Sequence, residues 1–256
     1  MSSIPTSRSG RDDRPRTSTL DRPVLMRLAS DEYERFGDLL GALPASDATR
    51  LTDCPGWDVR TMASHVLGMA EMAASFRDGR RQQKAAFARG GVFIHALTAV
   101  QVDERTHMTL GQITSRFRVV GPKAARARRR LPALVRRRRM PVAQSVGGQD
   151  EQWTLGYLMD TIITRDVWMH RLDIANAVGT VPHLTADHDG VLVGDVVREW
   201  AARHGEPCAV DLTGVAGGSW TFGSGGPAFC VDAVEFCRTL ARREPAKGLL
   251  AVEVPF

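Results

Sequence analysis

Apolar residues recur three or four positions apart through most of the first 180 residues, a spacing typical of amphipathic helices. The pattern predicts four long helices, at about 24–43, 58–76, 91–117 and 154–178. Asp58 is a suitable N-cap for the second helix, and Gly179 followed by Pro182 is a suitable end for the fourth. Four long helices that share one core predict a helix bundle.

The pattern changes after residue 182. A helix at about 184–204 is followed by strand-like runs, a further helix and a closing strand, at 209–213, 218–222, 231–243 and 249–256. The glycines at 223, 225 and 226 lack the context of a nucleotide-binding loop and are interpreted as hairpin glycines. We therefore predict an α+β protein with a disordered leader (1–23), a four-helix bundle (24–182) and a small C-terminal α/β domain (183–256).

Composition is that of a globular protein, with 43% hydrophobic residues in a chain of 256. No apolar run approaches the roughly 20 residues that span a bilayer, so no membrane span is expected. Residues 1–23 lack the apolar stretch of a secretory signal. The four cysteines show no Cys-x-x-Cys spacing, which predicts reduced thiols in a cytoplasmic protein, with Cys230 and Cys237 both facing the core from one helix.

The net charge of +5 is concentrated in one arginine-rich segment, 123–139, which contains no acidic residue. Its nine cations are Lys123, Arg126, Arg128, Arg129, Arg130, Arg136, Arg137, Arg138 and Arg139. Such a density attracts nucleic acid or anionic lipid. Three prolines interrupt the region, however, and no aromatic residue is interleaved to stack on bases. We favour a solvated connection between two helices and expect neither a nucleic-acid partner nor a membrane partner.

One constellation points to chemistry. Asp166 and His170 are four residues apart and therefore project from one face of the fourth helix. His65, on the second helix, completes a set of three ligands for a divalent metal with one position left open. The histidines at 95, 107, 183, 188 and 204 have no comparable carboxylate partner in the predicted bundle. Spacing alone does not exclude the alternative that each histidine binds no metal and has its hydrogen bonds satisfied within the fold.

Two segments resemble a known family. Residues 51–68, LTDCPGWDVRTMASHVLG, resemble the Cys-Pro-Gly-Trp…His signature of the mycothiol-dependent maleylpyruvate isomerase family, which belongs to the DinB-like bundle superfamily. Residues 165–179 resemble its second metal-binding segment, and 232–250 its C-terminal domain. The resemblance implies zinc held by His65, Asp166 and His170. The family pattern has Glu where this chain has Asp166, which is one methylene shorter. Aspartate is also a zinc ligand, so metal binding is expected to survive this change.

The resemblance also implies the chemistry. Zinc at such a site stabilises the thiolate of mycothiol, a low-molecular-weight thiol, which then isomerises a small electrophile or is transferred to it. Maleylpyruvate is one candidate substrate, because a fold does not fix a function. By the same resemblance Arg243 anchors a substrate carboxylate, although a solvated arginine at a helix end is an equal interpretation.

Three further residues have two interpretations each. Arg171 and Asp173 either orient His170 or form a surface pair. Cys54 precedes Pro55 and Gly56, which favours loop packing over a catalytic thiol.

The sequence thus predicts a cytoplasmic, zinc-dependent, mycothiol-using isomerase or S-transferase that is a monomer or homodimer. Nickel, cobalt or iron would fit the same ligands. The competing class is a non-catalytic binding protein that contacts nucleic acid or an anionic partner through the arginine-rich segment. A family member that has kept the metal and lost catalysis is a third possibility.

Overall fold

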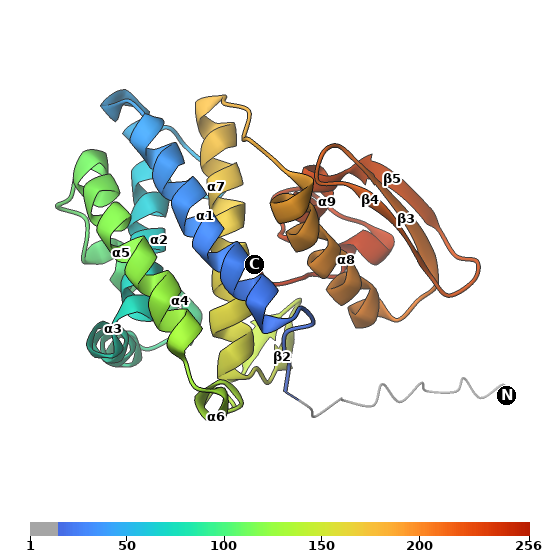
Figure 1. Ribbon diagram of the computed structural model, residues 1–256, viewed down its shortest axis with the longest axis horizontal. Helices are drawn as coiled ribbons and strands as arrows, with labels where there is room; N and C mark the ends of the chain where they lie inside the picture. The colour runs from blue at the N-terminus through green and yellow to red at the C-terminus, as the bar shows by residue number, and fades with distance from the viewer. Residues whose placement is uncertain (1–14) are drawn as a thin grey trace, which may run out of the picture.

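A computed structural model describes residues 15–256, and it consists of a helical bundle beside a smaller α/β unit (Figure 1). Four helices form the bundle: α1 (Arg22–Ala42), α2 (Val59–Ala74), α5 (Leu110–Arg130) and α7 (Ile163–Val178). Their apolar faces meet in one core that includes Phe36, Met62, Val66, Phe117 and Val167. The predicted bundle is confirmed.

Two predicted helix ends are confirmed by their capping geometry. The Asp58 side chain accepts a hydrogen bond of 2.7 Å from the backbone N–H of Thr61, which starts α2. Gly179 has φ 72° at the C-terminus of α7, a left-handed conformation that glycine adopts without steric cost. These caps define the start of the helix that carries His65 and the end of the helix that carries His170.

The predicted third helix at 91–117 is wrong, because the structure has two helices there. α4 (Phe93–Asp103) ends before a turn, and Thr109 and Gln112 form a capping box that starts α5. An additional helix, α3 (Phe76–Arg89), precedes α4, and a 3-10 turn, η1 (Ala45–Thr49), precedes α2. The pattern missed α3 because its buried positions are Gly79, Gln82 and Ala86, which carry no hydrophobic periodicity.

The prediction that the arginine-rich segment is a connection between helices is also wrong for residues 123–130. This stretch forms the last turns of α5, and Pro122 lies inside the helix. Beyond it lie the short helix α6 (Ala133–Arg136) and a hairpin of β1 (Gln144–Val146) and β2 (Gln149–Glu151). A π-helical turn, η2 (Tyr157–Ile162), then leads into α7.

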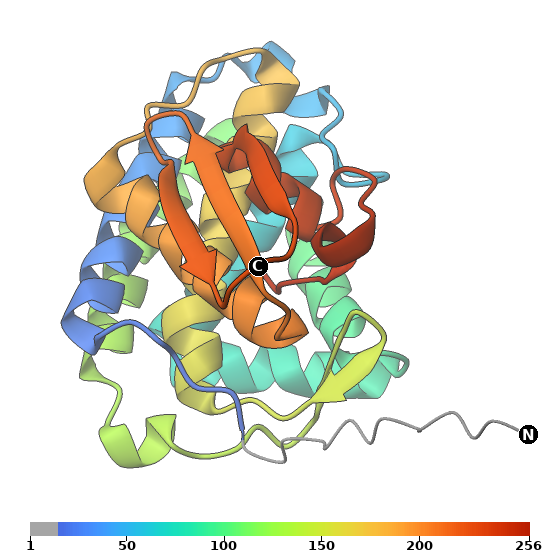
Figure 2. The same cartoon turned by 90° about the vertical axis from the view of Figure 1, so that its right-hand side faces the viewer.

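The C-terminal unit is a three-stranded sheet with two helices on one face. The sheet has the order β4 (Gly218–Phe222), β3 (Cys208–Thr213), β5 (Ala228–Asp232), and β3 runs antiparallel to β4 and parallel to β5. A π-helical turn, η3 (Ala186–Gly190), starts α8 (Val191–His204), and α9 (Ala233–Leu240) follows β5. Both helices lie between the sheet and the bundle (Figures 1 and 2).

Three finer predictions in this unit are wrong. The glycines at 223–226 join β4 to β5, which flank β3 and do not pair with each other, so they are not hairpin glycines. The closing strand at 249–256 is a 3-10 turn, η4 (Gly248–Ala251), followed by unpaired chain. Cys230 is exposed on β5 while Cys237 is buried in α9. The predicted α+β fold class is confirmed.

The two units share a second core. Leu28 of α1 and Trp168 of α7 pack there with Val196, Trp200 and Phe236 of the C-terminal helices. The C-terminal unit therefore covers the outer face of α7 and is placed to contribute side chains to a site on that helix.

Residues 1–14 of the predicted leader lie outside the described residues. Arg16 exchanges backbone hydrogen bonds with Gln152 (2.8 Å) and Thr154 (3.1 Å), so the fold includes the chain from Arg16 rather than from Val24. Among the described helices, none is by itself long and apolar enough to cross a membrane. The bent pair α3 and α4, at 116°, passes that test by length and composition.

Candidate metal centre

The structure brings His65, Asp166 and His170 together at the contact of α2 and α7. The Nε2 atom of His65 lies 3.4 Å from Oδ1 of Asp166, and Nε2 of His170 lies 3.5 Å from the same oxygen. All three side chains are nearly buried. Two nitrogens and one carboxylate oxygen thus converge on one point inside the bundle.

The spacing of these atoms fits a metal better than it fits hydrogen bonds. Separations of 3.4 and 3.5 Å are longer than ordinary N–H···O contacts, whereas donors about 2.0–2.2 Å from a tetrahedral zinc ion lie about 3.4 Å apart. Nδ1 of His65 and Oδ2 of Asp166 are buried without a hydrogen-bond partner. The residues present therefore fit a zinc ion, and their role as ligands stays a prediction.

Electrostatics couple the three groups. Burial opposes the charge on Asp166, but the imidazoles of His170 and His65 outweigh it and hold the pKa of the carboxyl well below its usual range. Burial likewise opposes a charge on His170, but Asp166 outweighs it and raises the pKa of that imidazole to about 9. A cation is therefore favoured at this point, whether it is a proton on His170 or a metal ion.

The loop with the sequence Cys-Pro-Gly-Trp covers the centre. Its ends are closed by a hydrogen bond of 2.9 Å from the backbone N–H of Thr52 to the carbonyl of Trp57. The ring centroid of Trp57 lies 5.3 Å from that of His65 and 6.0 Å from that of His170. The indole thus packs against both imidazoles and shields them from water.

Cys54 lies in the same loop, with Sγ 3.9 Å from Oδ2 of Asp173. Burial raises the pKa of its thiol to about 11; the charge of Arg243 opposes this shift, and the neighbouring carboxylates add to it. Cys54, His170 and Asp173 offer ligand atoms within 4.8 Å of one another, as the first three residues do. Because Asp173 is already held by arginines, we regard this second group as packing around the centre.

Asp173 orients His170. Nδ1 of His170 lies 3.2 Å from Oδ2 of Asp173, an arrangement in which Nδ1 donates and Nε2 is free to face the centre. Burial opposes the charge on Asp173, but the contacts with His170 and Arg243 keep the pKa of this carboxyl below its usual value. The first interpretation of Asp173, an orienting role, agrees with this geometry, and the residue is fully buried rather than on the surface.

Arg243 reaches the centre from the C-terminal unit. Its guanidinium donates a hydrogen bond of 2.8 Å to Asp173, and Arg238 lies 3.6 Å from the same carboxylate. Arg243 therefore lies beside the centre rather than at a solvated helix end. Its role toward a substrate carboxylate stays a prediction.

Arg171 pairs with Glu32 and Asp189 and not with Asp173. Its guanidinium donates to Glu32 (2.6 Å) and to Asp189 (2.7 Å), and His188 Nε2 lies 2.7 Å from Glu32. The expectation that His188 has no carboxylate partner in the bundle is thus wrong. Glu32 lies 156 residues away from it, and no local spacing signals the contact. This cluster joins α1 and α7 to the C-terminal unit.

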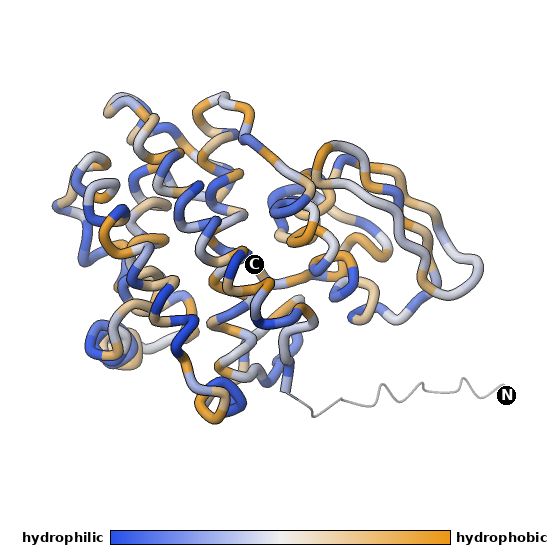
Figure 3. The backbone as a smooth tube through the Cα atoms, in the orientation of Figure 1, coloured by the Kyte–Doolittle hydropathy of each residue, from blue (hydrophilic) through white to orange (hydrophobic). Residues whose placement is uncertain are grey.

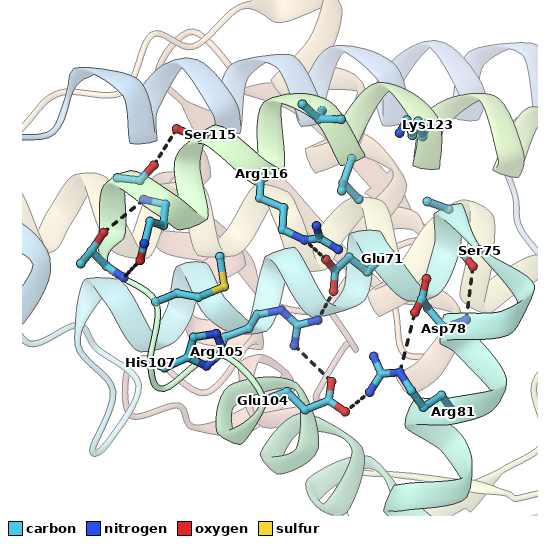
Figure 4. A pocket seen from close by; sticks show the side chains of 17 residues that line it. Glu71, Ser75, Asp78, Arg81, Glu104, Arg105, His107, Ser115, Arg116 and Lys123 are labelled. Carbon is cyan, nitrogen blue, oxygen red and sulfur yellow. Dashed lines mark hydrogen bonds and ion pairs between the residues drawn. The ribbon is translucent and has the colours of Figure 1, made fainter.

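A separate hollow of about 1390 Å³ lies between α2, α3, α4 and α5 (Figure 4). Its floor is the buried Glu71, which pairs with Arg105 and Arg116. None of the three candidate ligands lines it. The candidate metal centre and this hollow are therefore distinct.

Comparison with known proteins identifies the family. The sequence profile of the mycothiol maleylpyruvate isomerase N-terminal domain matches residues 29–175, more than half of the chain and the part that holds all three candidate ligands. The chain belongs to this family. A search of curated proteins finds no match.

Two solved structures have the same fold. One is a mycothiol-dependent maleylpyruvate isomerase, with 14% sequence identity and a TM-score of 0.57. The other is a histidine-to-alanine variant of a mycothiol-dependent maleylpyruvate isomerase, with 13% identity and the same TM-score. In each case the alignment covers 90% of this chain and 93% of the other, so the likeness includes the C-terminal unit. Membership indicates a mycothiol-dependent, isomerase-like enzyme.

Proposed function

We propose that this member of the family is a zinc-dependent enzyme that uses mycothiol to isomerise a small, acidic electrophile. The observation that carries the proposal is the convergence of His65, Asp166 and His170 at spacings that suit a tetrahedral metal ion. When bound, zinc lowers the pKa of a thiol that occupies its open position and so makes the thiol a nucleophile at neutral pH.

Three side chains near the centre orient a candidate ligand, exclude water and attract the substrate. Asp173 accepts a hydrogen bond from Nδ1–H of His170 and so fixes which ring nitrogen faces the centre. Trp57 packs over both imidazoles and excludes water, which strengthens electrostatic interactions there. Arg243, anchored on Asp173, carries positive charge beside the centre, where it attracts the carboxylate of an acidic substrate.

The thiolate adds to one carbon of a cis double bond that is conjugated with a carbonyl, and the displaced electron pair moves onto the carbonyl oxygen. The former double bond is then a single bond that rotates. Departure of the thiol then restores the double bond in the trans form, and no thiol is consumed. In S-transfer the thiol stays on the product. Cys54 is not the nucleophile in this scheme, because burial raises the pKa of its thiol to about 11.

The test is an activity assay with zinc-loaded protein, mycothiol and maleylpyruvate, followed by detection of the trans isomer and of free thiol. We expect isomer formation without thiol loss, abolished in Asp166→Ala and retained in Cys54→Ser. Loss of thiol in step with product would indicate S-transfer. Full activity of Asp166→Ala would contradict the proposal.

A further inference from the structure

Helix α3 exposes its two largest apolar side chains. Its buried residues are Gly79, Gln82 and Ala86, while its two largest apolar side chains, Phe76 and Phe87, are 81% and 57% exposed. A surface helix of a globular protein ordinarily turns its large apolar residues toward the core. The outward phenylalanines are therefore not explained by the packing of the bundle.

The exposed apolar surface continues around the corner from α3 to α4. The ring of Phe87 lies 4.7 Å from that of Phe93, and Val92 and Ile94 beside it are also exposed. In Figure 3 α3 is seen end-on at the lower left, and most of its visible turns are hydrophilic (blue). Contiguous exposed apolar side chains of this kind mark interaction surfaces.

Unpaired cations accompany these apolar residues. Arg77, Arg80 and Lys84 are exposed on α3 and have no ion-pair partner within residues 15–256. The guanidinium of Arg80 lies 5.6 Å from the centre of the Phe76 ring. Arg81 and Arg89 differ, because they pair with Glu104 and Asp103.

The arginine-rich segment lies at the same end of the bundle. In both views α3 and α6 lie toward the lower end of the molecule (Figures 1 and 2), and Leu134 of α6 is 73% exposed. The exposed cations of this segment are Lys123, Arg126, Arg129, Arg130, Arg137, Arg138 and Arg139. Lys123 of α5 and Arg81 of α3 line the same hollow (Figure 4), so the first cation of the segment lies across that hollow from α3.

We propose that this basic end surface docks on the anionic headgroups of a phospholipid bilayer. The surface consists of the outer face of α3, the corner Val92–Ile94, the exposed cations of 123–139 and Leu134. Its cations attract anionic lipid, and Phe76 and Phe87 insert at the boundary of headgroups and acyl chains. The protein is bound at the membrane surface and does not span it.

Charge and side-chain chemistry favour lipid over other partners. A second copy of the chain would present the same cations, and like charges repel. A nucleic acid would satisfy the cations, but Val92, Ile94 and Leu134 would find no apolar partner on it. A bilayer with anionic headgroups satisfies both kinds of side chain at once.

The test is flotation of the full-length protein with phosphatidylcholine vesicles, with and without phosphatidylglycerol, at low and physiological salt. We expect binding to the anionic vesicles alone. Each cation removed weakens binding about fivefold, so Arg80→Gln with Lys84→Gln weakens it about twenty- to thirtyfold. Phe76→Ser with Phe87→Ser weakens it about tenfold or more, because the inserted apolar area is lost.

Matched variants on other surfaces control for charge and hydrophobicity. Arg198→Gln with Lys247→Gln removes two exposed cations from the C-terminal unit, and Val181→Ser with Val215→Ser removes two exposed apolar side chains. Both controls are expected to bind like the wild type.

Three results would overturn the proposal. The first is no binding of the wild type to anionic vesicles. The second is unchanged binding of the phenylalanine variant. The third is binding of duplex DNA that displaces the vesicles and does not depend on Phe76 or Phe87.

Discussion

His170 and Asp173 form the contact that links the candidate metal centre to the C-terminal unit. Nδ1 of His170 lies 3.2 Å from Oδ2 of Asp173, and Arg243 donates to the same oxygen over 2.8 Å. A side chain of the α/β unit thereby helps to fix the orientation of a candidate metal ligand on the bundle. The C-terminal unit is part of the site, not an appendage to it.

Asp173→Asn should weaken zinc binding about 10–100-fold, because an amide fixes the tautomer and basicity of His170 less well than a carboxylate does. Zinc affinity by competition with a chelator measures the loss, with circular dichroism to confirm intact helices. Asp211→Asn, which alters an exposed carboxylate bonded to Ser219, is the control and should bind like the wild type. Equal affinity of both variants would remove the orienting role.

Metal binding should depend on pH through His170. Its pKa is raised from 6.5 to about 9 in the metal-free protein, so the imidazole holds a proton at neutral pH that a metal ion must displace. Apparent zinc affinity should therefore rise about tenfold per pH unit between about 7 and 9 and rise less steeply above. An affinity that does not change over this range would contradict the assignment of His170.

The same shift sets the sign of a stability effect. Because the pKa of His170 is higher in the folded protein than in the unfolded chain, protonation of this imidazole stabilises the metal-free fold. The contribution is fully present below the ordinary pKa of 6.5 and is lost as the pH rises through about 9. Unfolding in urea at several pH values, with His170→Gln as the comparison, measures it.

Arg171→Met should destabilise the fold by about 3–5 kcal/mol, because it leaves the buried carboxylates of Glu32 and Asp189 without their shared cation. Urea unfolding monitored by tryptophan fluorescence gives the difference. Arg27→Met is the matched control: it removes a half-exposed ion pair with Asp31 and should cost no more than about 1 kcal/mol. Similar costs for both would mean that the buried cluster contributes little to stability.

The cysteines should react with iodoacetamide in a fixed order. Cys230 is exposed and should be labelled first, whereas burial raises the pKa of Cys54 to about 11 and that of Cys237 further. Peptide mass spectrometry over time resolves the four sites. Labelling of Cys54 as fast as Cys230 would show a reactive thiol beside the centre and would reopen its role as a nucleophile.

The sequence predicted those parts of the site that depend on local spacing. Asp166, His170 and Asp173 lie on consecutive turns of one helix, and helix geometry alone places them on one side. The contact of Glu32 with His188 joins two distant segments through the tertiary fold, so no periodicity could signal it. Arg243 came from family resemblance, and its partner Asp173 became clear in the structure.

The errors in the predicted fold also have specific causes. The helix α3 was missed because its inward positions are small residues, and the hydrophobic pattern follows side-chain size. The segment 249–256 alternates like a strand, but its residues pack against the C-terminal core without pairing with the sheet. Hydrophobic periodicity reports burial, and it does not report which backbone groups bond to one another.

The most direct test of the central claim is elemental analysis of the purified protein after zinc is supplied. We expect about one zinc ion per chain in the wild type and in Asp166→Glu, and none in Asp166→Ala or His170→Ala with helicity preserved. His95→Ala, which removes an exposed histidine of α4, should keep its zinc. A wild type without zinc, or a His170→Ala variant that retains it, would contradict the assignment of His65, Asp166 and His170 as the metal ligands.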